Sequence, residues 1–334
     1  MAATKTEKPG VVAIRFENGV LHAIDQTELP WNERQLELRT AAEVAEAIRR
    51  LAIRGAPLIG VAAAYGVALE LASEGPESLE RACELLRTAR PTAVNLSAAV
   101  ERVRQAVLRG AAALDEARAI EAEEEAASAA IATHGADVLS NAGAGRILTH
   151  CNTGALAAPG RGTALAVIAE LADRGVLQKA IATESRPLLQ GARLTVYELT
   201  RLGIPHELVV DSAAPGLIAS GAVDAVIVGC DRVAANGDVA NKVGTYGLAL
   251  AAQAAGIPFV VAGPTSTIDP ATPTGGDITI EERDPDEVRT AAGRMLTLPG
   301  TRTRNPAFDV TPAALVTALV TERGVLPPPF TPPL

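Results

Sequence analysis

The amino-acid sequence predicts an α/β protein in which a C-terminal Rossmann-like parallel-sheet domain follows a smaller, mostly helical N-terminal domain with a short β-hairpin. Three features lead to this prediction. Short apolar segments alternate with helix-like segments from Gly145 onward, the residues before it carry apolar and charged side chains at helical spacing, and an Asn18-Gly19 pair separates two alternating segments near the N-terminus. Alternation of strands and helices is typical of βαβ units and therefore of a parallel sheet.

The composition fits a soluble globular protein with two domains and a sizeable core. The chain has 334 residues, 48% hydrophobic and 21% charged, with a formal net charge of −9. The acidic balance and an aromatic content of 2% disfavour nucleic acid as a partner, so a phosphate site would need a local cluster of Arg and Lys. Three cysteines without paired spacing favour a reducing compartment.

The N-terminus and the apolar segments predict a cytoplasmic protein with no membrane association. Residues 1–10 lack the apolar core of a secretory signal. The apolar stretch Pro57–Leu71 is shorter than a bilayer span requires. The proline-rich tail, residues 327–334, is expected to be extended or loose.

The N-terminal domain is expected to cover residues 1–142. Asn-Gly between alternating apolar residues is the strongest short signal for a hairpin, and it predicts strands at Val12–Phe16 and Val20–Ile24. Helical spacing follows, with a break at Arg54–Pro57 and an interruption at Ala142–Gly145 that marks the predicted boundary. The helices predicted between these points are Thr40 to about Gly75, Ser97–Ala113 and Glu116–Ser140.

The second domain, residues 143–334, is expected to hold the parallel sheet. Five short apolar segments are its predicted strands: Arg146–His150, Lys179–Thr183, His206–Val210, Ala225–Gly229 and Pro258–Ala262. The helices expected between them include Gly162–Arg174, Gly191–Leu202 and Thr245–Ala255.

The segment Val226–Lys242 is the most informative about chemistry. An apolar strand ends at Asp231, and a polar loop carrying Asn241 and Lys242 is expected after it. Ligands bind at the carboxyl ends of strands in open parallel sheets, so Asp231 is expected at the mouth of a site with Lys242 near enough to hold an anion. Apolar surroundings would raise the pKa of Asp231 and let it donate a proton near neutral pH.

Polar residues follow all five predicted strands, and together they predict a ligand site at one edge of the sheet. Two N-terminal loops, Arg54–Pro57 and Arg90–Leu96, place an Arg beside the amides at the start of a helix, which suits an anion. An exposed Arg is the alternative for each loop. The polar segments that follow the strands are His150–Leu156, Glu184–Gly191, Asp211–Ala214, the Asp231 loop and Gly263–Asp269.

Cys151 is a candidate reactive thiol, with a buried small side chain as the alternative. His150 and Asn152 flank it and would be able to orient it or lower its pKa. Adjacent strand residues point to opposite faces, which disfavours a Cys–His hydrolase dyad. Neither a zinc-binding spacing nor a glycine signature for dinucleotides is present in the sequence, so zinc and nicotinamide are not expected.

Taken together these segments resemble methylthioribose-1-phosphate isomerase. The resemblance runs in one register from about residue 11 to residue 325. The matching stretches are Arg54–Pro57, Gly60–Gly66, Arg90–Leu96, Thr149–Asn152, Arg186–Thr195, Asp231–Lys242, Gly244–Gly247, Pro264–Asp269, Glu281–Pro285 and Asn305–Pro312.

This resemblance implies an isomerase of methionine salvage that converts S-methyl-5-thio-α-D-ribose 1-phosphate to S-methyl-5-thio-D-ribulose 1-phosphate. The family uses an Asp as proton donor and a Cys that assists the transition state, which correspond to Asp231 and Cys151. A homodimer without metal or cofactor is also implied. The family's substrate contacts fall on Arg54, Gly55, Ala56, Arg90, Gln190, Asn241 and Lys242.

Alternatives stay open because the fold is shared. They are an isomerase of ribose 1,5-bisphosphate or of 5-deoxyribose 1-phosphate, and a non-catalytic regulatory subunit like those of translation initiation factor 2B. A second phosphate would require further basic groups, and a regulatory subunit would have no need of both Cys151 and Asp231. Cys230 in place of the family's usual Ala, Ser185 in place of Thr and a varied loop at 158–161 leave the substrate preference open.

Overall fold

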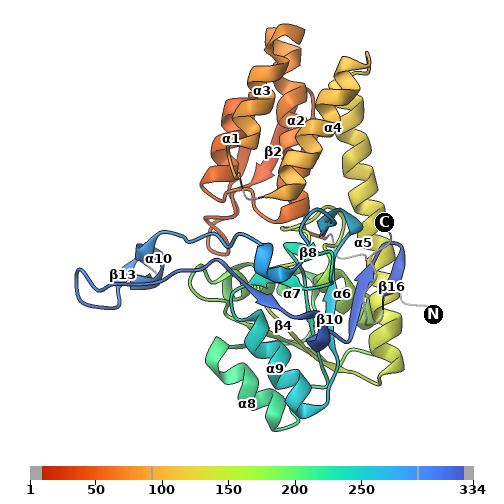
Figure 1. Cartoon of the computed structure of the whole chain (residues 1–334), viewed down its shortest axis with the longest axis vertical. Helices are drawn as coiled ribbons and strands as arrows, with labels where there is room; N and C mark the ends of the chain where they lie inside the picture. Colours follow the sequence, from red (N-terminus) through yellow and green to blue (C-terminus); the bar gives the residue numbers. More distant parts are fainter. Residues whose placement is uncertain (1–9, 92, 292, 327–334) are drawn as a thin grey trace, which may run out of the picture.

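The computed structural model describes residues 10–91, 93–291 and 293–326. It has a helical N-terminal part, at the top in Figure 1, that sits on a C-terminal α/β part. The predicted fold class is confirmed, because the C-terminal strands form one large, mainly parallel sheet with helices on both faces. The tail predicted at residues 327–334 lies outside the described ranges, as do residues 1–9.

The N-terminal part begins with a small antiparallel sheet. Strands β1 (Ile14–Glu17) and β2 (Val20–Ile24) pair around the Asn18-Gly19 turn as predicted, and β3 (Gln35–Leu38) pairs with β2. The helix α3 (Leu79–Arg87) was not predicted, although its buried residues recur at helical spacing. The other helices of this part are α1 (Ala41–Arg49), α2 (Ala56–Glu74), α4 (Val94–Leu108) and α5 (Ala113–Asn141).

Helix α2 is the central element of the N-terminal part. Its side chains are buried on nearly all sides against α1, α3, α4 and α5. By length and composition it could cross a membrane, which corrects the expectation that this stretch is too short. However, 78% of its apolar window is buried inside the protein, as in the core helix of a globular domain.

The large sheet has the strand order β16-β15-β10-β7-β4-β5-β6. The chain starts in the middle at β4, extends to one side through β5 and β6, and then returns to the other side of β4 with β7. The five predicted strands all form; β15 and the antiparallel edge strand β16 were not predicted. Their bounds are β4 Arg146–Thr149, β5 Lys179–Thr183, β6 His206–Val209, β7 Ala225–Val228, β10 Phe259–Ala262, β15 Ala318–Thr321 and β16 Gly324–Leu326.

Two apolar cores cover the two faces of this sheet. Neighbouring strand residues such as Ile147 and Leu148 belong to different cores, as the alternation of side chains requires. Helices α6 (Ala164–Asp173) and α7 (Val196–Leu202) contribute to one core, and α8 (Ala214–Ala219) and α9 (Thr245–Ala255) to the other.

Helix α5 connects the two parts of the molecule. Ala117 near its start packs in the N-terminal core, and Ile131 and Leu139 near its end pack against the large sheet. The boundary predicted at Ala142–Gly145 lies between the end of α5 and the start of β4. A continuous helix therefore joins the two parts, and the division at residue 142 stays a prediction.

The segment after Asp231 is not the loop that its polar residues suggest. It forms strands β8 (Arg232–Ala234) and β9 (Val239–Lys242), which belong to a separate four-stranded sheet with β11 (Ile268–Asp269) and β14 (Phe308–Thr311). The turn polarity of Asn236–Asp238 was recognisable, but the pairing of β9 with β14 joins residues far apart in sequence. Asn241 and Lys242 consequently lie on a strand buried along its whole length.

A narrow arm projects from the C-terminal part, at the left of Figure 1. It contains helix α10 (Pro285–Arg289) and a small hairpin of β12 (Thr290–Ala291) and β13 (Arg294–Met295). Its side chains Met295, Leu296 and Leu298 are exposed.

Candidate active site

Asp231 and Cys151 lie just beyond the ends of two adjacent parallel strands. Cys151 follows β4 and Asp231 follows β7, and these strands are hydrogen-bonded neighbours. The chain direction across the sheet reverses between them, and ligands bind at this switch point in open α/β sheets. The strand order thus brings together two residues that are eighty positions apart in sequence.

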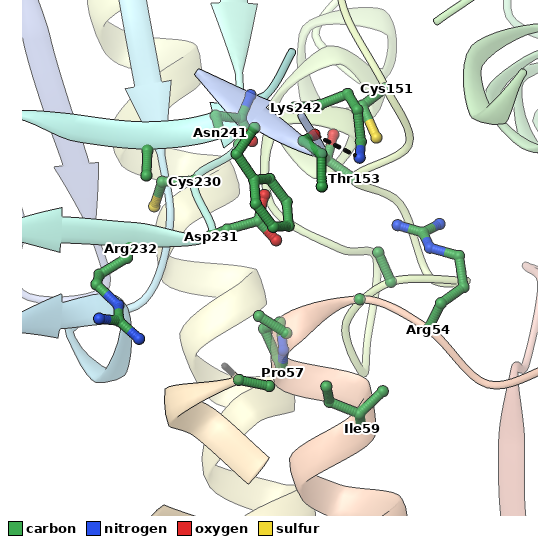
Figure 2. A pocket seen from close by; sticks show the side chains of 18 of the residues that line it. Arg54, Pro57, Ile59, Cys151, Thr153, Cys230, Asp231, Arg232, Asn241 and Lys242 are labelled. Carbon is green, nitrogen blue, oxygen red and sulfur yellow. Dashed lines mark hydrogen bonds between the residues drawn. The ribbon is translucent and has the colours of Figure 1, made fainter. Parts of the chain in front are cut away.

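A cavity lies between this sheet edge and the start of helix α2. Figure 2 shows Asp231, Cys151, Lys242 and Arg54 around it, with Pro57 and Ile59 of α2 on the opposite side. The nine residues predicted for the site all line this cavity: Arg54, Gly55, Ala56, Arg90, Cys151, Gln190, Asp231, Asn241 and Lys242.

Asp231 has the surroundings of a proton donor. Its side chain reaches the cavity surface but is otherwise enclosed by protein, and this burial raises the pKa of Asp231 above the usual value. The cations of Lys242, Arg90 and Arg54 act in the opposite direction and only reduce the shift. Burial therefore dominates, and the carboxyl holds its proton at higher pH than an ordinary Asp.

Lys242 is held beside the acid by β9. Its ammonium Nζ donates a hydrogen bond to the Ala307 carbonyl oxygen at 2.8 Å and lies 4.7 Å from the centre of the Phe308 ring. Burial lowers the pKa of Lys242, while Cys151 and Asp231 favour its charged form. The preceding residue, Asn241, donates to Thr245 Oγ1 at 2.9 Å, which fixes its amide at the cavity wall.

Arg54 approaches the cavity from the N-terminal part. Its guanidinium donates to the Asn152 side-chain oxygen and, at 2.8 Å, to the Asn152 carbonyl oxygen. Gly55 follows with φ of +94°, and a Cβ at this position would lie 2.3 Å from the Ala157 carbonyl oxygen, so only glycine fits. The turn at the start of α2 therefore packs directly on the loop that follows β4.

Arg90 lies on the same side of the cavity, ahead of α4. Its guanidinium forms an ion pair of 2.9 Å with Glu281, which also pairs with Arg283 at 2.9 Å. Both arginines line the cavity. The Glu281 carboxylate thus holds two cations at one wall.

Gln190 contributes a polar group that is available to form a hydrogen bond with a ligand. Its side chain is buried, and its Oε1 accepts no hydrogen bond from any residue within the described ranges. The next residue must be glycine, because a Cβ on Gly191 would lie 1.7 Å from the Thr183 carbonyl oxygen. A buried acceptor without a partner is costly unless a ligand hydroxyl fills the gap.

Cys151 is held in an unusual backbone conformation. Its φ is +65°, the left-handed region that costs a non-glycine residue roughly 1 kcal/mol or more. Main-chain hydrogen bonds maintain it: Cys151 N donates to Ser185 Oγ at 2.7 Å, and Thr195 Oγ1 donates to the Cys151 carbonyl oxygen at 2.6 Å. The half-buried thiol consequently lines the cavity in a fixed place.

His150 does not serve Cys151 as a base. Its Nδ1 lies 2.5 Å from Thr183 Oγ1 and its Nε2 lies 2.9 Å from the Val243 carbonyl oxygen. A carbonyl can only accept, so Nε2 carries the hydrogen and Nδ1 accepts from Thr183. Burial lowers the pKa of His150, which favours this neutral form. Both ring nitrogens are therefore engaged away from the thiol.

One of the five polar strand ends does not reach the cavity, contrary to the prediction. β6 is the edge strand, and Asp211 after it accepts hydrogen bonds from the amides of Ser185 and Arg186, both at 2.7 Å. It supports the loop after β5, which leads to Gln190. Asp211 is therefore structural.

Cys230 precedes Asp231 in sequence, but its side chain is packed away from the Asp231 carboxyl. Its sulfur lies 3.3 Å from Thr267 Oγ1, and in Figure 2 it points away from the Asp231 carboxylate. Burial raises the pKa of Cys230 to about 12. The thiol packs against Gly263, where an added Cβ would lie 2.3 Å from the sulfur.

Several lining residues were not singled out from the sequence, although most lie in the matching segments. Arg283 and Phe308 belong to two of those segments, and Thr153 follows Cys151 and Asn152. Arg283 and Phe308 lie far in sequence from the predicted strand ends, which gave no reason to place them in the site, whereas Thr153 lies in the predicted segment His150–Leu156. Pairing of β14 with β9 is what brings Phe308 opposite Lys242.

The fold and the site define an α/β enzyme that acts on an anionic substrate: a buried acid and a thiol at the switch point, with cations around them. Residues 52–328 match the Initiation factor 2 subunit family. The methylthioribose-1-phosphate isomerase of Anaeromyxobacter sp. (strain K) is 54% identical over 311 residues, covering 92% of this chain and 91% of that protein.

Solved structures agree with this match. The 5-methylthioribose 1-phosphate isomerase from Pyrococcus horikoshii OT3 superposes with a TM-score of 0.91 at 40% identity, covering 98% of this chain and 96% of that one. Subunit delta of translation initiation factor eIF-2B from A. fulgidus reaches 0.85 at 39% identity, covering 96% and 97%. The chain belongs to the Initiation factor 2 subunit family and, within it, to the methylthioribose-1-phosphate isomerases, as its motifs predicted.

Proposed function

We propose that this chain isomerises S-methyl-5-thio-α-D-ribose 1-phosphate to S-methyl-5-thio-D-ribulose 1-phosphate in methionine salvage, as a cytoplasmic enzyme. The observation that carries the proposal is the position of Asp231 and Cys151 on one cavity at the ends of adjacent strands. A regulatory subunit would not require a desolvated acid and a thiol facing the same ligand. This pair matters because overall similarity extends to a protein named as a translation factor subunit.

Three cations of the cavity wall would form the binding site for the substrate phosphate. Arg54, Arg90 and Lys242 line the cavity and all act on the pKa of Asp231, so they surround the acid. At the start of α2, Pro57 has no N–H and Leu58 N donates to the Ala157 carbonyl oxygen at 3.1 Å. The amide of Ala56, beside Gly55, would therefore join Arg54 in binding phosphate.

The reaction needs an acid, because the phosphate on the anomeric oxygen prevents ordinary opening to an aldehyde. Asp231 would protonate the ring oxygen as its bond to C1 breaks, and C1 would take up positive charge. Hydrogen then moves from C2 to C1, and the C2 hydroxyl loses a proton to become the ketone. That proton balances the one given to the ring oxygen. Asn241 and the buried side-chain oxygen of Gln190, which has no hydrogen-bond partner among the described residues, would bind substrate hydroxyls.

Cys151 has two possible roles in the hydrogen shift. It would either take the C2 proton, which gives an enolate, or shape the site for direct hydride transfer. Substrate carrying deuterium at C2 distinguishes these roles. Deuterium retained at C1 of the product favours hydride transfer, and deuterium lost to solvent favours the enolate.

A bisphosphate substrate is less well supported. The cavity has two further arginines, Arg283 and Arg232, but carboxylates occupy both. Arg283 pairs with Glu281 and Glu287, and Arg232 lies 3.5 Å from Asp269. The rest of the wall includes Ile59, Leu188 and Ile278, which suit an apolar thioether better than a second phosphate.

A side-by-side assay tests the proposal. We expect kcat/KM for methylthioribose 1-phosphate to exceed that for ribose 1,5-bisphosphate by about 100-fold or more, because Arg283 and Arg232 would have to leave their carboxylate partners to bind the second phosphate. The 5-deoxyribose 1-phosphate analogue, which lacks only the thioether, should lose roughly 10-fold. Equal or faster turnover of the bisphosphate would contradict the assignment of substrate.

We also infer a homodimer in solution. Leu296, Leu298 and Met295 on the projecting arm are 59%, 79% and 54% exposed, and exposed apolar residues gathered on one element are typical of an interface. In a twofold dimer the same patch would be buried on both subunits.

The pair of substitutions Leu296→Asp and Leu298→Asp should convert the dimer to a monomer in size-exclusion chromatography with light scattering. Leu108→Asp, which changes an exposed leucine on α4, is the matched control and should remain dimeric. A monomeric unaltered protein, or a dimer that survives the paired arm substitutions, would contradict the inferred interface.

A further inference from the structure

Glu198 is a buried carboxylate that the proposed reaction does not use. It lies on α7 and is 2% exposed. Three nitrogen donors converge on it from the loop after β4: Asn152 Nδ2 at 2.7 Å, Ala155 N at 2.7 Å and Leu156 N at 3.4 Å. Burial raises the pKa of Glu198 to about 7, while these donors and the Arg54 cation favour its ionised form.

The Asn152 side chain lies between this carboxylate and Arg54. An ionised carboxylate only accepts hydrogen bonds and a guanidinium only donates them. Asn152 must therefore turn its Nδ2 toward Glu198 and its Oδ1 toward Arg54, and the structure has this arrangement. Glu198 thus orients the Asn152 amide so that its oxygen, and not its nitrogen, is directed toward Arg54.

The same loop supports the start of α2. A Cβ on Gly154 would lie 2.3 Å from the Glu198 carboxylate, so the main chain packs directly on it. The Ala157 carbonyl oxygen, next along the loop, accepts from Leu58 N at 3.1 Å and closely approaches Gly55. A displacement of the loop would consequently move both the guanidinium of Arg54 and the helix turn that bind phosphate in the proposed function.

We propose that Glu198 is a positioning residue: acting through the Asn152 amide and the loop Asn152–Ala157, it holds Arg54 and the start of α2 in the geometry that binds the substrate phosphate. This inference rests on the proposed function for its substrate, but not for its geometry. Glu198 does not line the cavity, so it acts only through these neighbours.

The substitution Glu198→Gln should disrupt the hydrogen bonds that link residue 198 through Asn152 to Arg54, with little change in side-chain volume. Its amide nitrogen would replace one carboxylate oxygen and face either Asn152 Nδ2 and Leu156 N or Ala155 N, all of which are donors. An Asn152 side chain that rotates to accept from this nitrogen would present Nδ2 to the Arg54 guanidinium. We expect the Kd for inorganic phosphate, measured by calorimetry on the full chain, to rise about tenfold or more. KM for methylthioribose 1-phosphate should rise with it, and kcat should fall less than KM rises. Glu207→Gln, which alters an exposed carboxylate paired with Lys179, should leave both constants unchanged.

A double-mutant cycle separates positioning from a general effect on stability. If Glu198 acts through Arg54, the variant with both Glu198→Gln and Arg54→Ala should bind phosphate no more weakly than Arg54→Ala alone. Additive losses, or a lower melting temperature with phosphate affinity and KM unchanged, would overturn the inference. If Glu198→Gln does not fold, Asn152→Ala removes the same link while the Ala155 and Leu156 amides keep their acceptor, and it should give the same loss. Failure of the unaltered protein to turn over the sugar phosphate would reject the proposed function alone, because phosphate binding is measured separately.

Discussion

The variant Asp231→Asn is expected to keep its fold and its KM for methylthioribose 1-phosphate while kcat falls about 100-fold or more, as loss of an acid catalyst does. The amide has almost the same shape but has no acidic proton to give to the ring oxygen. Burial disfavours the ionised form of Asp231, so replacing this carboxyl by a neutral amide should leave the melting temperature unchanged or raise it. Steady-state kinetics and a thermal melt on the same preparation measure both effects.

The matched control is Asp173→Asn, an exposed carboxylate paired with Arg161 on the surface, and its kinetics should not change. Turnover of Asp231→Asn near that of the unaltered protein would reject the acid assignment. A rise in KM without loss of kcat would instead make Asp231 a binding residue.

The pH dependence follows from the same burial. The protonated carboxyl is the active form, so kcat/KM should fall as pH rises through the pKa of Asp231. Because burial raises this pKa, the fall should occur at higher pH than an ordinary aspartic acid would show. The residual activity of Asp231→Asn should lack this fall. The second ionisation of the substrate phosphate, at about pH 6, affects the unaltered protein and Asp231→Asn alike. A fall in kcat/KM that only the unaltered protein shows is therefore due to Asp231.

Local patterns in the sequence were sufficient for most elements of the sheet. The bounds of β5 and of α9 coincide with those predicted, because an apolar run of strand length and a helical segment are each properties of a few neighbouring residues. The same reasoning placed Asp231 and Cys151 at strand ends. Motif resemblance, rather than periodicity, singled out Gln190 and Asn241 as substrate contacts.

What the sequence could not provide is the order of the strands. Alternation of β and α predicts a parallel sheet but not that β4 and β7 are neighbours, and this adjacency is what places Cys151 beside Asp231. Nor did it predict that β6 lies at the edge, which removes Asp211 from the site. The strands β8, β9 and β14 also escaped prediction: β8 and β9 pair as a hairpin around the turn at Asn236–Asp238, and β9 pairs in addition with β14, which is distant in sequence.

Replacement of Cys151 by Ser should lower kcat about 100-fold, even though the two side chains have nearly the same shape. The backbone at this position is held by the Cys151 main-chain N and O, which bond to Ser185 and Thr195 and do not depend on the side chain. A loss of activity would therefore come from the chemistry of the sulfur. The sulfur lies within electrostatic range of Lys242, and a serine hydroxyl is a much weaker acid and nucleophile than a thiol.

Alkylation gives a second measurement that does not depend on turnover. Burial raises the pKa of Cys83 to about 11 and that of Cys230 to about 12, so iodoacetamide near pH 8 should label Cys151 first among the three thiols. Bound inorganic phosphate should slow this labelling, because Cys151 lines the same cavity as Arg54 and Lys242. Cys83→Ala, in the N-terminal core, is the control that should keep full activity. A fully active Cys151→Ser enzyme, together with labelling that phosphate does not slow, would make this thiol a structural residue and leave Asp231 as the one chemical group at the switch point.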